Sequence, residues 1–438
     1  MIAWKSERQR QPLLLRGARQ IGKSFTIEKF GREHFESIVT VDFDLYPDFA
    51  KVFEGTLEPK EICTGLSVIA NREILPGKTL LFLDEIQQCP RAILALRYFH
   101  ERLPAQHVIG AGSLLEFALS AEDMRMPVGR IRYLHMFPLT FAEFLEAAGQ
   151  GLALRAMEAG GPGQPVPEAI HDRLLSLLKT YLVLGGMPAV IREYLGSGNM
   201  AACARIQAGL AQTYRDDFGK YASKVRLPEL RKLFAAVPKM VGQKFKYAAV
   251  DDTVHSRALK EGLDLLEKAG VVSRVKRTSG SGLPFEAGAD DRNFKAVFLD
   301  VGLMQSLCGL GGELLAADDI LAVHAGAVAE QFVGQELRAH ADPDMPQGLY
   351  YWAREARTSN AEVDYLLSAG SKVLPLEVKA GRSGTLKSLH LFLSEYRAPL
   401  GIRISQHNRS LENSLLSVPL YAMHTLERMI GKTLEGSA

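Results

Sequence analysis

The sequence predicts an α/β protein with a parallel sheet in its N-terminal part, a mostly helical middle part and a small α/β domain near the C-terminus. Three observations lead to this fold class. Short, continuous apolar runs alternate with helical stretches before residue 162, apolar residues recur at helical spacing between about 168 and 275, and extended segments follow a helix after residue 320. Continuous apolar strands separated by helices are typical of a parallel sheet that is covered on both faces.

The composition is that of an ordinary globular protein. The 438 residues suffice for about two to four domains. Apolar residues make up 47% and charged residues 23%, which excludes a disordered chain or a collagen-like repeat. The 52 Lys and Arg against 50 Asp and Glu give a formal charge of +2. This balance excludes a histone-like nucleic-acid binder and leaves room for a local basic groove.

Cysteine usage and the length of the apolar runs indicate in which cellular compartment the protein is expected. The four cysteines form no CxxC pair, so we expect reduced thiols rather than a zinc site or a disulfide framework. The N-terminus has no apolar core of signal-peptide length. The longest weakly polar run, Tyr181–Ile191, is much shorter than the about 20 residues of a membrane-spanning helix. We therefore expect a cytoplasmic protein without a membrane partner.

The first domain is expected over residues 1–155. Its strands are predicted from four apolar runs, which are Pro12–Arg16, Ser37–Phe43, Thr79–Leu83 and His107–Gly110. A stretch dense in Gly and Pro, residues 156–167, ends this domain. The spacing of the runs leaves room for helices between them, as a parallel sheet requires.

The second domain is expected over residues 168–310 and the third over 320–425. In the second, Leu259, Leu263 and Leu266 recur at helical spacing, and strands are predicted at Val271–Val275 and Lys295–Leu299 across a flexible loop. Helix, strand, loop, strand is the order of a winged helix. In the third, a helix at 325–340 precedes extended segments at 348–354, 362–367 and 372–378, which predicts a small α/β domain.

The first run leads into a phosphate-binding motif. Residues 17–24 match GxxxxGK[ST] in full. Glycines allow the backbone to curl so that its N–H groups and the following helix N-terminus bind phosphate oxygens. Lys23 would bridge the β- and γ-phosphates, and Ser24 would offer its hydroxyl to Mg²⁺. The predicted ATP-binding residues are Gly17, Ala18, Arg19, Gln20, Ile21, Gly22, Lys23, Ser24 and Phe25.

The second half of the site is expected at the end of the Thr79–Leu83 strand. Asp84 can hold Mg²⁺ directly or through water, and Glu85 can deprotonate the attacking water. Together with the glycine loop, these acids predict a P-loop NTPase sheet of the AAA/ASCE type. Ser113 follows the next strand, where a polar side chain can sense the γ-phosphate. Arg130 is the candidate arginine that would act on a neighbouring subunit of a homo-oligomer; the alternative is a solvated surface arginine.

Several segments in series carry a family resemblance. The segments RGARQIGKS, LLFLDEIQ, IGAGSLLEF and GRIRYLHMFPLTFAEFL, followed by YLVLGGMPAVI, FKAVFLDVGLMQSL and AEVDYLLSAGSKVLPLEVKAG, resemble the AAA-superfamily ATPases of bacteria and archaea that carry a C-terminal domain of unknown function. The resemblance covers about residues 12–400. It departs at Ser113, because that family often has two serines where this chain has Ser113-Leu114.

The resemblance also implies a nuclease-like C-terminal domain of the PD-(D/E)xK type. Asp364, Glu377 and Lys379 fit the spacing D-x₁₂-ExK on two neighbouring strands, whose alternation places all three on one face. Glu330 on the preceding helix would join them. Two carboxylates would hold a second Mg²⁺ or Mn²⁺ that polarises a phosphodiester, with Lys379 positioning the water. The alternative is an exposed strand face of alternating charge.

Nucleic-acid binding is the remaining question for the sequence. The predicted helix before residue 270 carries a mixed set of charges rather than a basic face, while Arg274, Lys276 and Arg277 on the next strand could contact phosphates. We expect a Mg²⁺-dependent ATPase that drives a DNA-binding, nuclease-like domain. The alternatives are an ATP-gated module that binds DNA or a protein without cleaving, and a small-molecule kinase.

Overall fold

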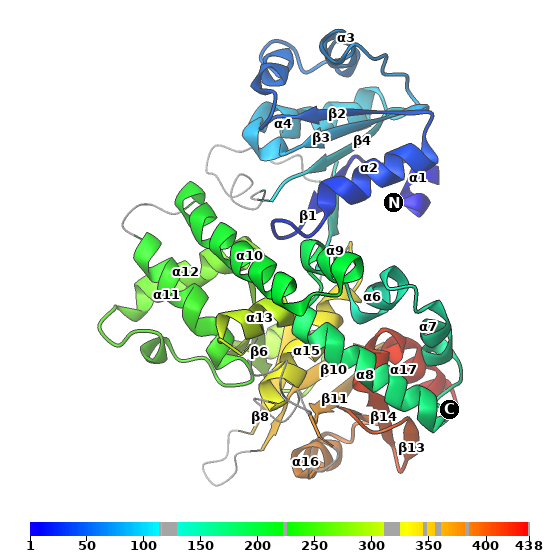
Figure 1. The fold of residues 1–438 in the computed structure, drawn as a ribbon, viewed down its shortest axis with the longest axis vertical. Coiled ribbons are helices and arrows are strands. Elements are labelled where there is room, and N and C mark those ends of the chain that lie inside the picture. Colours follow the sequence, from blue (N-terminus) through cyan, green and yellow to red (C-terminus); the bar gives the residue numbers. More distant parts are fainter. Residues whose placement is uncertain are drawn as a thin grey trace. The chain divides into compact units, whose positions relative to one another are not determined.

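The computed structural model describes residues 1–113, 115, 129–221, 226–310, 325–344, 348–354, 361–381 and 385–436. It divides into two compact units (Figure 1). The first unit consists of Met1–Phe137 with Lys268–Gly270 and Asp342–Pro346, and the second of Pro138–Glu267, Val271–Ala341 and Gln347–Ala438. None of the helices in the described ranges has the length and apolarity needed to cross a membrane.

The first unit contains a parallel sheet of five strands in the order β2-β3-β4-β1-β5. The strands are β1 (Leu13–Arg16), β2 (Ser37–Asp42), β3 (Thr79–Asp84), β4 (His107–Ala111) and β5 (Arg132–His135). The helices are α1 (Ile2–Ser6), α2 (Lys23–His34), α3 (Pro59–Ala70) and α4 (Pro90–Arg102), with the 3-10 turns η1 (Pro47–Phe53) and η2 (Ile86–Gln88). The predicted α/β class with a parallel sheet is confirmed.

Both faces of this sheet are covered, which explains the continuous apolar runs. Side chains of β1 and β3 alternate between two cores: Leu14 and Leu81 belong to the core under α3 and α4, whereas Leu13 and Leu80 belong to the core under α1 and α2. Figure 1 shows these two pairs of helices on opposite faces of the sheet. Because successive strand residues point to opposite faces, a strand buried on both sides needs an apolar residue at every position.

The parallel order determines where the functional loops lie. Strand β4 pairs with both β1 and β3, so the segments that follow these three strands emerge at the same edge of the sheet. These segments begin at Gly17, Glu85 and Gly112. Ligands of open α/β sheets bind at the carboxyl ends of the strands, and the first unit therefore concentrates its candidate residues at this edge.

The second unit begins with helices, as predicted for the middle of the chain. They are α6 (Phe141–Ala147), α7 (Gly151–Glu158), α8 (Glu168–Leu184), α9 (Pro188–Ser197), α10 (Met200–Tyr221), α11 (Leu227–Ala236), η3 (Val237–Met240), η4 (Tyr247–Ala249), α12 (Ser256–Lys268) and α13 (Val301–Leu307). The last residue of α12, Lys268, is assigned to the first unit. Buried Asp300 caps α13 by accepting hydrogen bonds from the N–H groups of Leu303, at 2.9 Å, and of Gly186, at 2.6 Å.

Two sheets complete the second unit. One has the order β7-β6-β8-β9 and the other β10-β11-β12-β14-β13. Their strands are β6 (Val272–Thr278), β7 (Ala289–Phe298), β8 (Leu349–Ala353), β9 (Glu362–Val363), β10 (Tyr365–Ala369), β11 (Lys372–Val378), β12 (Gly401–Ser405), β13 (Ser410–Glu412) and β14 (Leu415–Pro419). The remaining elements are η5 (Phe285–Gly288), α15 (Ala325–Ala339), α16 (Lys387–Tyr396), η6 (Leu420–Thr425) and α17 (Leu426–Glu435).

The hairpin expected to form a wing is part of a larger sheet. Strand β6 pairs antiparallel with β7 on one side and parallel with β8 on the other. The order helix, strand, strand that predicts a winged helix is present as α12, β6 and β7, but β8 comes from the predicted third domain. The winged-helix assignment and the domain boundaries 1–155, 168–310 and 320–425 stay predictions.

Candidate functional site

The loop after β1 has a backbone that glycine alone suits at two positions. Gly17 has φ +144°, and a Cβ atom there would lie 2.3 Å from the carbonyl oxygen of Met136. Gly22 has φ +97° and is the N-cap of α2. Side chains rarely adopt such angles. The loop therefore curls tightly and presents the N-terminus of a helix, which is the backbone arrangement that binds phosphate.

Lys23 is the first residue of α2, and its side chain lies inside this curl. The side chain is 8% exposed, and Nζ donates to the carbonyl oxygens of Gly17 at 3.0 Å and Ala18 at 2.7 Å. Burial lowers the pKa of Lys23 to about 8, against the opposing charges of Glu85 and Asp84. A buried ammonium whose acceptors are neutral carbonyls is stabilised by an anionic ligand.

Ser24 and Asp84 meet at the same edge of the sheet. The Ser24 hydroxyl donates a hydrogen bond to the Asp84 carboxylate, which stands at the end of β3 opposite Asp42 of β2. Burial raises the pKa of Asp84, partly offset by the bond from Ser24, and the charge of Asp42 adds to the rise. A carboxylate and a hydroxyl at a helix start are the protein ligands that Mg²⁺ takes beside nucleotide phosphates, so these residues fit the metal.

Glu85 is held in a constrained position directly after β3. Its φ of +47° lies in the left-handed region, which is uncommon for a residue with a side chain and occurs at functional sites. The Gln87 side-chain amide donates to the Glu85 carboxylate. The other end of the amide packs against the loop after β4, because a Cβ at Gly112 would lie 1.8 Å from Gln87 Oε1.

Gln87 thus connects two of the predicted catalytic segments. Ser113 follows Gly112 directly and is buried, so the amide that bonds the candidate base Glu85 packs against the residue that precedes the candidate sensor Ser113. Gln87 Oε1 is buried and has no hydrogen-bond partner among the described residues. The sequence analysis missed Gln87, although a polar residue two positions after the acids is a signal that could have indicated it.

The other predicted residues of this site differ in placement. Phe25 is 69% exposed, and the positive charge of Arg19 acts on Lys23. Arg130 lies away from these residues in its own chain and pairs with Glu101 on α4 at 3.0 Å, with about half of its side chain exposed. Its action on a neighbouring subunit stays a prediction.

The predicted C-terminal residues are brought together by β10 and β11. Asp364 lies between β9 and β10, and its Oδ2 accepts a hydrogen bond from the N–H of Val378 at 2.8 Å. Glu377 is 6% exposed and pairs with Lys379 at 2.6 Å. Burial raises the pKa of Glu377, and the charge of Asp364 raises it further. The charge of Asp364 therefore acts on Glu377, and the shared site of these residues stays a prediction.

A lysine that the sequence analysis did not assign to the site lies among these acids. Lys295 on β7 places Nζ 3.1 Å from Glu330, 2.5 Å from Glu362 and 3.3 Å from Asp364, with 4% of its side chain exposed. Burial alone would lower the pKa of Lys295, but the three carboxylates outweigh it and hold the pKa well above its usual value. We call Lys295, Glu330, Glu362, Asp364, Glu377 and Lys379 the carboxylate cluster.

A second metal does not fit the carboxylate cluster as it stands. Within the described ranges, no three Asp, Glu, His or Cys side chains lie close enough together to hold a metal ion. The position between Glu330, Glu362 and Asp364 is taken by the Lys295 ammonium. The signal for Lys295 in the sequence is a single charge inside the apolar strand run Phe294–Phe298, which indicates a buried and therefore paired group.

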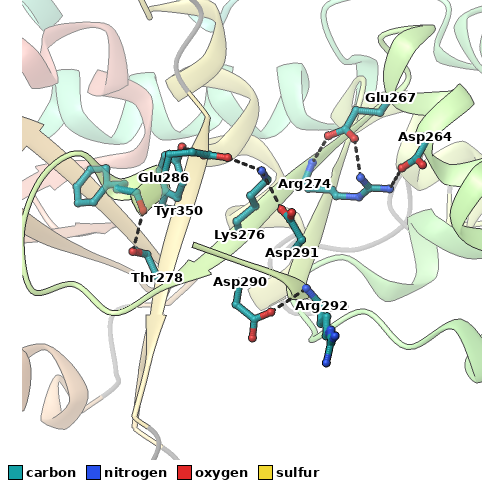
Figure 2. Close-up of polar contacts among 11 residues, drawn as sticks. Asp264, Glu267, Arg274, Lys276, Thr278, Glu286, Asp290, Asp291, Arg292 and Tyr350 are labelled. Carbon is teal, nitrogen blue, oxygen red and sulfur yellow. Dashed lines mark hydrogen bonds and ion pairs between the residues drawn. The ribbon is translucent and has the colours of Figure 1, made fainter. Parts of the chain in front are cut away.

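Arg274 and Lys276 of β6 are paired with acids (Figure 2). Arg274 contacts Asp264 and lies 3.1 Å from Glu267. Lys276 lies 2.8 Å from Glu286 and 3.0 Å from Asp291. Arg277 likewise pairs with Asp290 at 3.1 Å. Because Arg274, Lys276 and Arg277 each have a carboxylate partner, a DNA phosphate would have to compete for them.

Three family models match consecutive parts of the chain. Residues 9–145 match an AAA domain, residues 175–314 match a domain of unknown function (DUF8612), and residues 325–422 match another domain of unknown function (DUF4143). The first unit is thus similar in sequence to AAA domains and has the parallel α/β sheet of P-loop ATPases. None of the curated proteins is significantly similar in sequence to this chain.

Solved structures give remote matches. A Walker-type ATPase of Pyrococcus abyssi is 18% identical, with 68% of this chain and 91% of that chain covered and a TM-score of 0.43. The Aeropyrum pernix ORC2 protein in ADPNP–ADP complexes is 12% identical, with 70% and 89% covered and a TM-score of 0.35. AMPPCP-bound DnaA from Aquifex aeolicus is 10% identical, with 59% and 82% covered and a TM-score of 0.21. These matches carry no argument about activity.

Proposed function

We propose that the first unit binds ATP with Mg²⁺ and hydrolyses it. The observation that supports this proposal is the meeting, at one edge of the sheet, of the curled loop with Lys23, of the Ser24–Asp84 hydrogen bond and of Glu85. The loop N–H groups and Lys23 would hold the phosphates. Ser24 and Asp84 would hold Mg²⁺, which supplies charge neutralisation for the phosphate oxygens.

Within this proposal Glu85 is the general base and Gln87 is a positioning residue. The Glu85 carboxylate accepts the proton of the attacking water, and the amide of Gln87 fixes the direction in which that carboxylate points. Ser113 reports the γ-phosphate to the same amide through Gly112. Water is preferred to a substrate hydroxyl as acceptor because two acids, Asp84 and Glu85, follow β3 directly.

The test compares nucleotide binding with phosphate release in the full chain. We expect Lys23→Ala to abolish both, and Glu85→Gln to keep ATP binding while hydrolysis falls by about 10²- to 10⁴-fold. Lys29→Ala is the matched control, because Lys29 is an exposed lysine of the same helix, 3.9 Å from Glu33. An unchanged turnover rate in the Lys23 variant, measured on protein free of other ATPases, would contradict the assignment.

For the second unit we propose that ATP binding gates contact with DNA or with a protein, without cleavage of nucleic acid. A nuclease-like fold for residues 320–425 remains part of this proposal. The observation that favours binding over cleavage is Lys295, which pairs with Glu330 and Asp364, two of the acids predicted to hold a metal. Fluorescence anisotropy with labelled duplex DNA tests the proposal: we expect affinity to differ between ATP and ADP, and equal affinities would contradict gating of DNA contact.

A further inference from the structure

The Lys295 side chain is built into the carboxylate cluster from a separate element. It comes from β7, whereas Glu330 comes from α15, Glu362 from β9 and Asp364 from the break between β9 and β10. Its side chain is almost fully buried, and its ammonium lies 5.5 Å from the centre of the Tyr351 ring on β8 while it contacts the acids. Three elements are therefore joined through one buried cation rather than through pairwise surface contacts.

An ammonium in this position performs the electrostatic task of a metal ion. Three N–H donors face three carboxylates, so the like charges of Glu330, Glu362 and Asp364 are offset at short distance. A divalent cation at the same point would be repelled by Lys295 and would find its ligands already engaged. Burying a lysine costs free energy unless the lysine is paired. The three carboxylates therefore stabilise the buried ammonium, and the ammonium stabilises the three carboxylates.

We propose that Lys295 is an internal cation that takes the place of a divalent metal in the carboxylate cluster, so that the native chain binds no metal there and does not cut phosphodiesters. This inference deepens the proposal for the second unit and is independent of the proposed ATP hydrolysis. Lys379, paired with Glu377 on β11, does not share this role, because it does not lie between the acids of the three elements.

The test counts bound Mn²⁺ by electron paramagnetic resonance on the full chain without nucleotide, so that the first unit lacks the phosphates that complete its own metal site. We expect the native protein to bind no Mn²⁺ that depends on Asp364. Lys295→Gln is expected to bind one Mn²⁺ per chain that the native protein does not bind at the same Mn²⁺ concentration, since a repelling charge is removed. Lys295→Gln with Asp364→Asn should lose that ion again.

Three results would overturn the proposal. One is a Mn²⁺ ion in the native protein that disappears with Asp364→Asn. The second is plasmid nicking by the native protein that Asp364→Asn abolishes. The third is folded Lys295→Gln protein, as judged by circular dichroism, that binds no additional Mn²⁺. If Lys295→Gln does not fold, the first two measurements still decide, because both use the native chain and the Asp364 variant. ATP turnover, measured in parallel, reports separately on the first unit.

Discussion

At the scale of single residues, Lys23 is buried in the loop that we propose binds phosphate. Its ammonium is shielded from water and faces the carbonyl oxygens of Gly17 and Ala18. Burial lowers its pKa to about 8, so the charge needed to bind phosphate is lost within an accessible pH range. The Walker-type lysine of this chain is therefore expected to make nucleotide binding depend on pH.

The first prediction follows from the sign of this shift. Below pH 8 Lys23 is charged in the free protein, and above it the group is increasingly neutral. Bound ATP stabilises the ammonium form of Lys23, so ATP binding near pH 8 takes up a proton. The affinity for ATP therefore falls as the pH rises from 7 to 9, by up to about tenfold per pH unit. Calorimetry in buffers of different ionisation enthalpy measures this uptake. Constant affinity without proton uptake would contradict the prediction.

The second prediction concerns Gln87, which bonds Glu85 and packs against Gly112. Gln87→Ala removes the group that orients the base, so we expect kcat for ATP to fall by about tenfold while KM changes little, as for loss of orientation. Gln88→Ala is the control, since Gln88 is the next residue in the chain and its side chain is exposed. A parallel rise in KM, or an unchanged kcat, would show that Gln87 has no positioning role.

At the scale of elements, the start of α13 depends on one buried carboxylate. Asp300 is completely buried and accepts hydrogen bonds from the backbone N–H groups of Gly186, at 2.6 Å, and Leu303, at 2.9 Å. It thereby ties the loop between α8 and α9 to the helix that follows β7. Buried N–H groups that lose their acceptor cost free energy, so this cap stabilises two elements at once.

The third prediction is that Asp300→Ala lowers the free energy of unfolding of the second unit by about 2–4 kcal/mol, because two buried donors lose their acceptor. Asp300→Asn keeps one acceptor oxygen and should cost less. The chain has two tryptophans, Trp4 in the first unit and Trp352 in the second. Urea denaturation in a Trp4→Phe background therefore follows the second unit by its fluorescence. Equal stability of Asp300→Ala and the parent would refute this role of the cap.

At the scale of the whole molecule, strand pairing connects the parts that the sequence separates. The hairpin of β6 and β7 continues into β8 and β9 through the pairs Val275–Leu349 and Thr278–Trp352. The domain boundary predicted between residues 310 and 320 therefore falls, along the sequence, between two strands of one sheet, β7 and β8. A sheet edge left open by removing β8 exposes unpaired N–H and C=O groups and apolar side chains.

The fourth prediction is that fragment 138–310 does not fold cooperatively, whereas fragment 138–438 does. The shorter fragment lacks β8, which pairs with β6, and loses Lys295's partners Glu330, Glu362 and Asp364. Buried Lys295 would then be unpaired, a loss of about 3–5 kcal/mol. Thermal melting followed by circular dichroism compares the two fragments. A sharp transition in the shorter one would show that the boundary at 310 separates independent domains.

The sequence by itself determined the parallel α/β class of the first unit and predicted the curled loop that we propose binds phosphate, because both depend on local properties. Apolar runs specify strands buried on both faces, and glycines next to Lys23 and Ser24 specify a curled backbone wherever it occurs. Only the tertiary structure decided that Lys295 meets Glu330 and Asp364, that Gln87 reaches Gly112, and that Lys276 of the hairpin is paired with acids. Those contacts join residues on different elements. Their partners are determined by strand register and long-range packing, which no local pattern encodes.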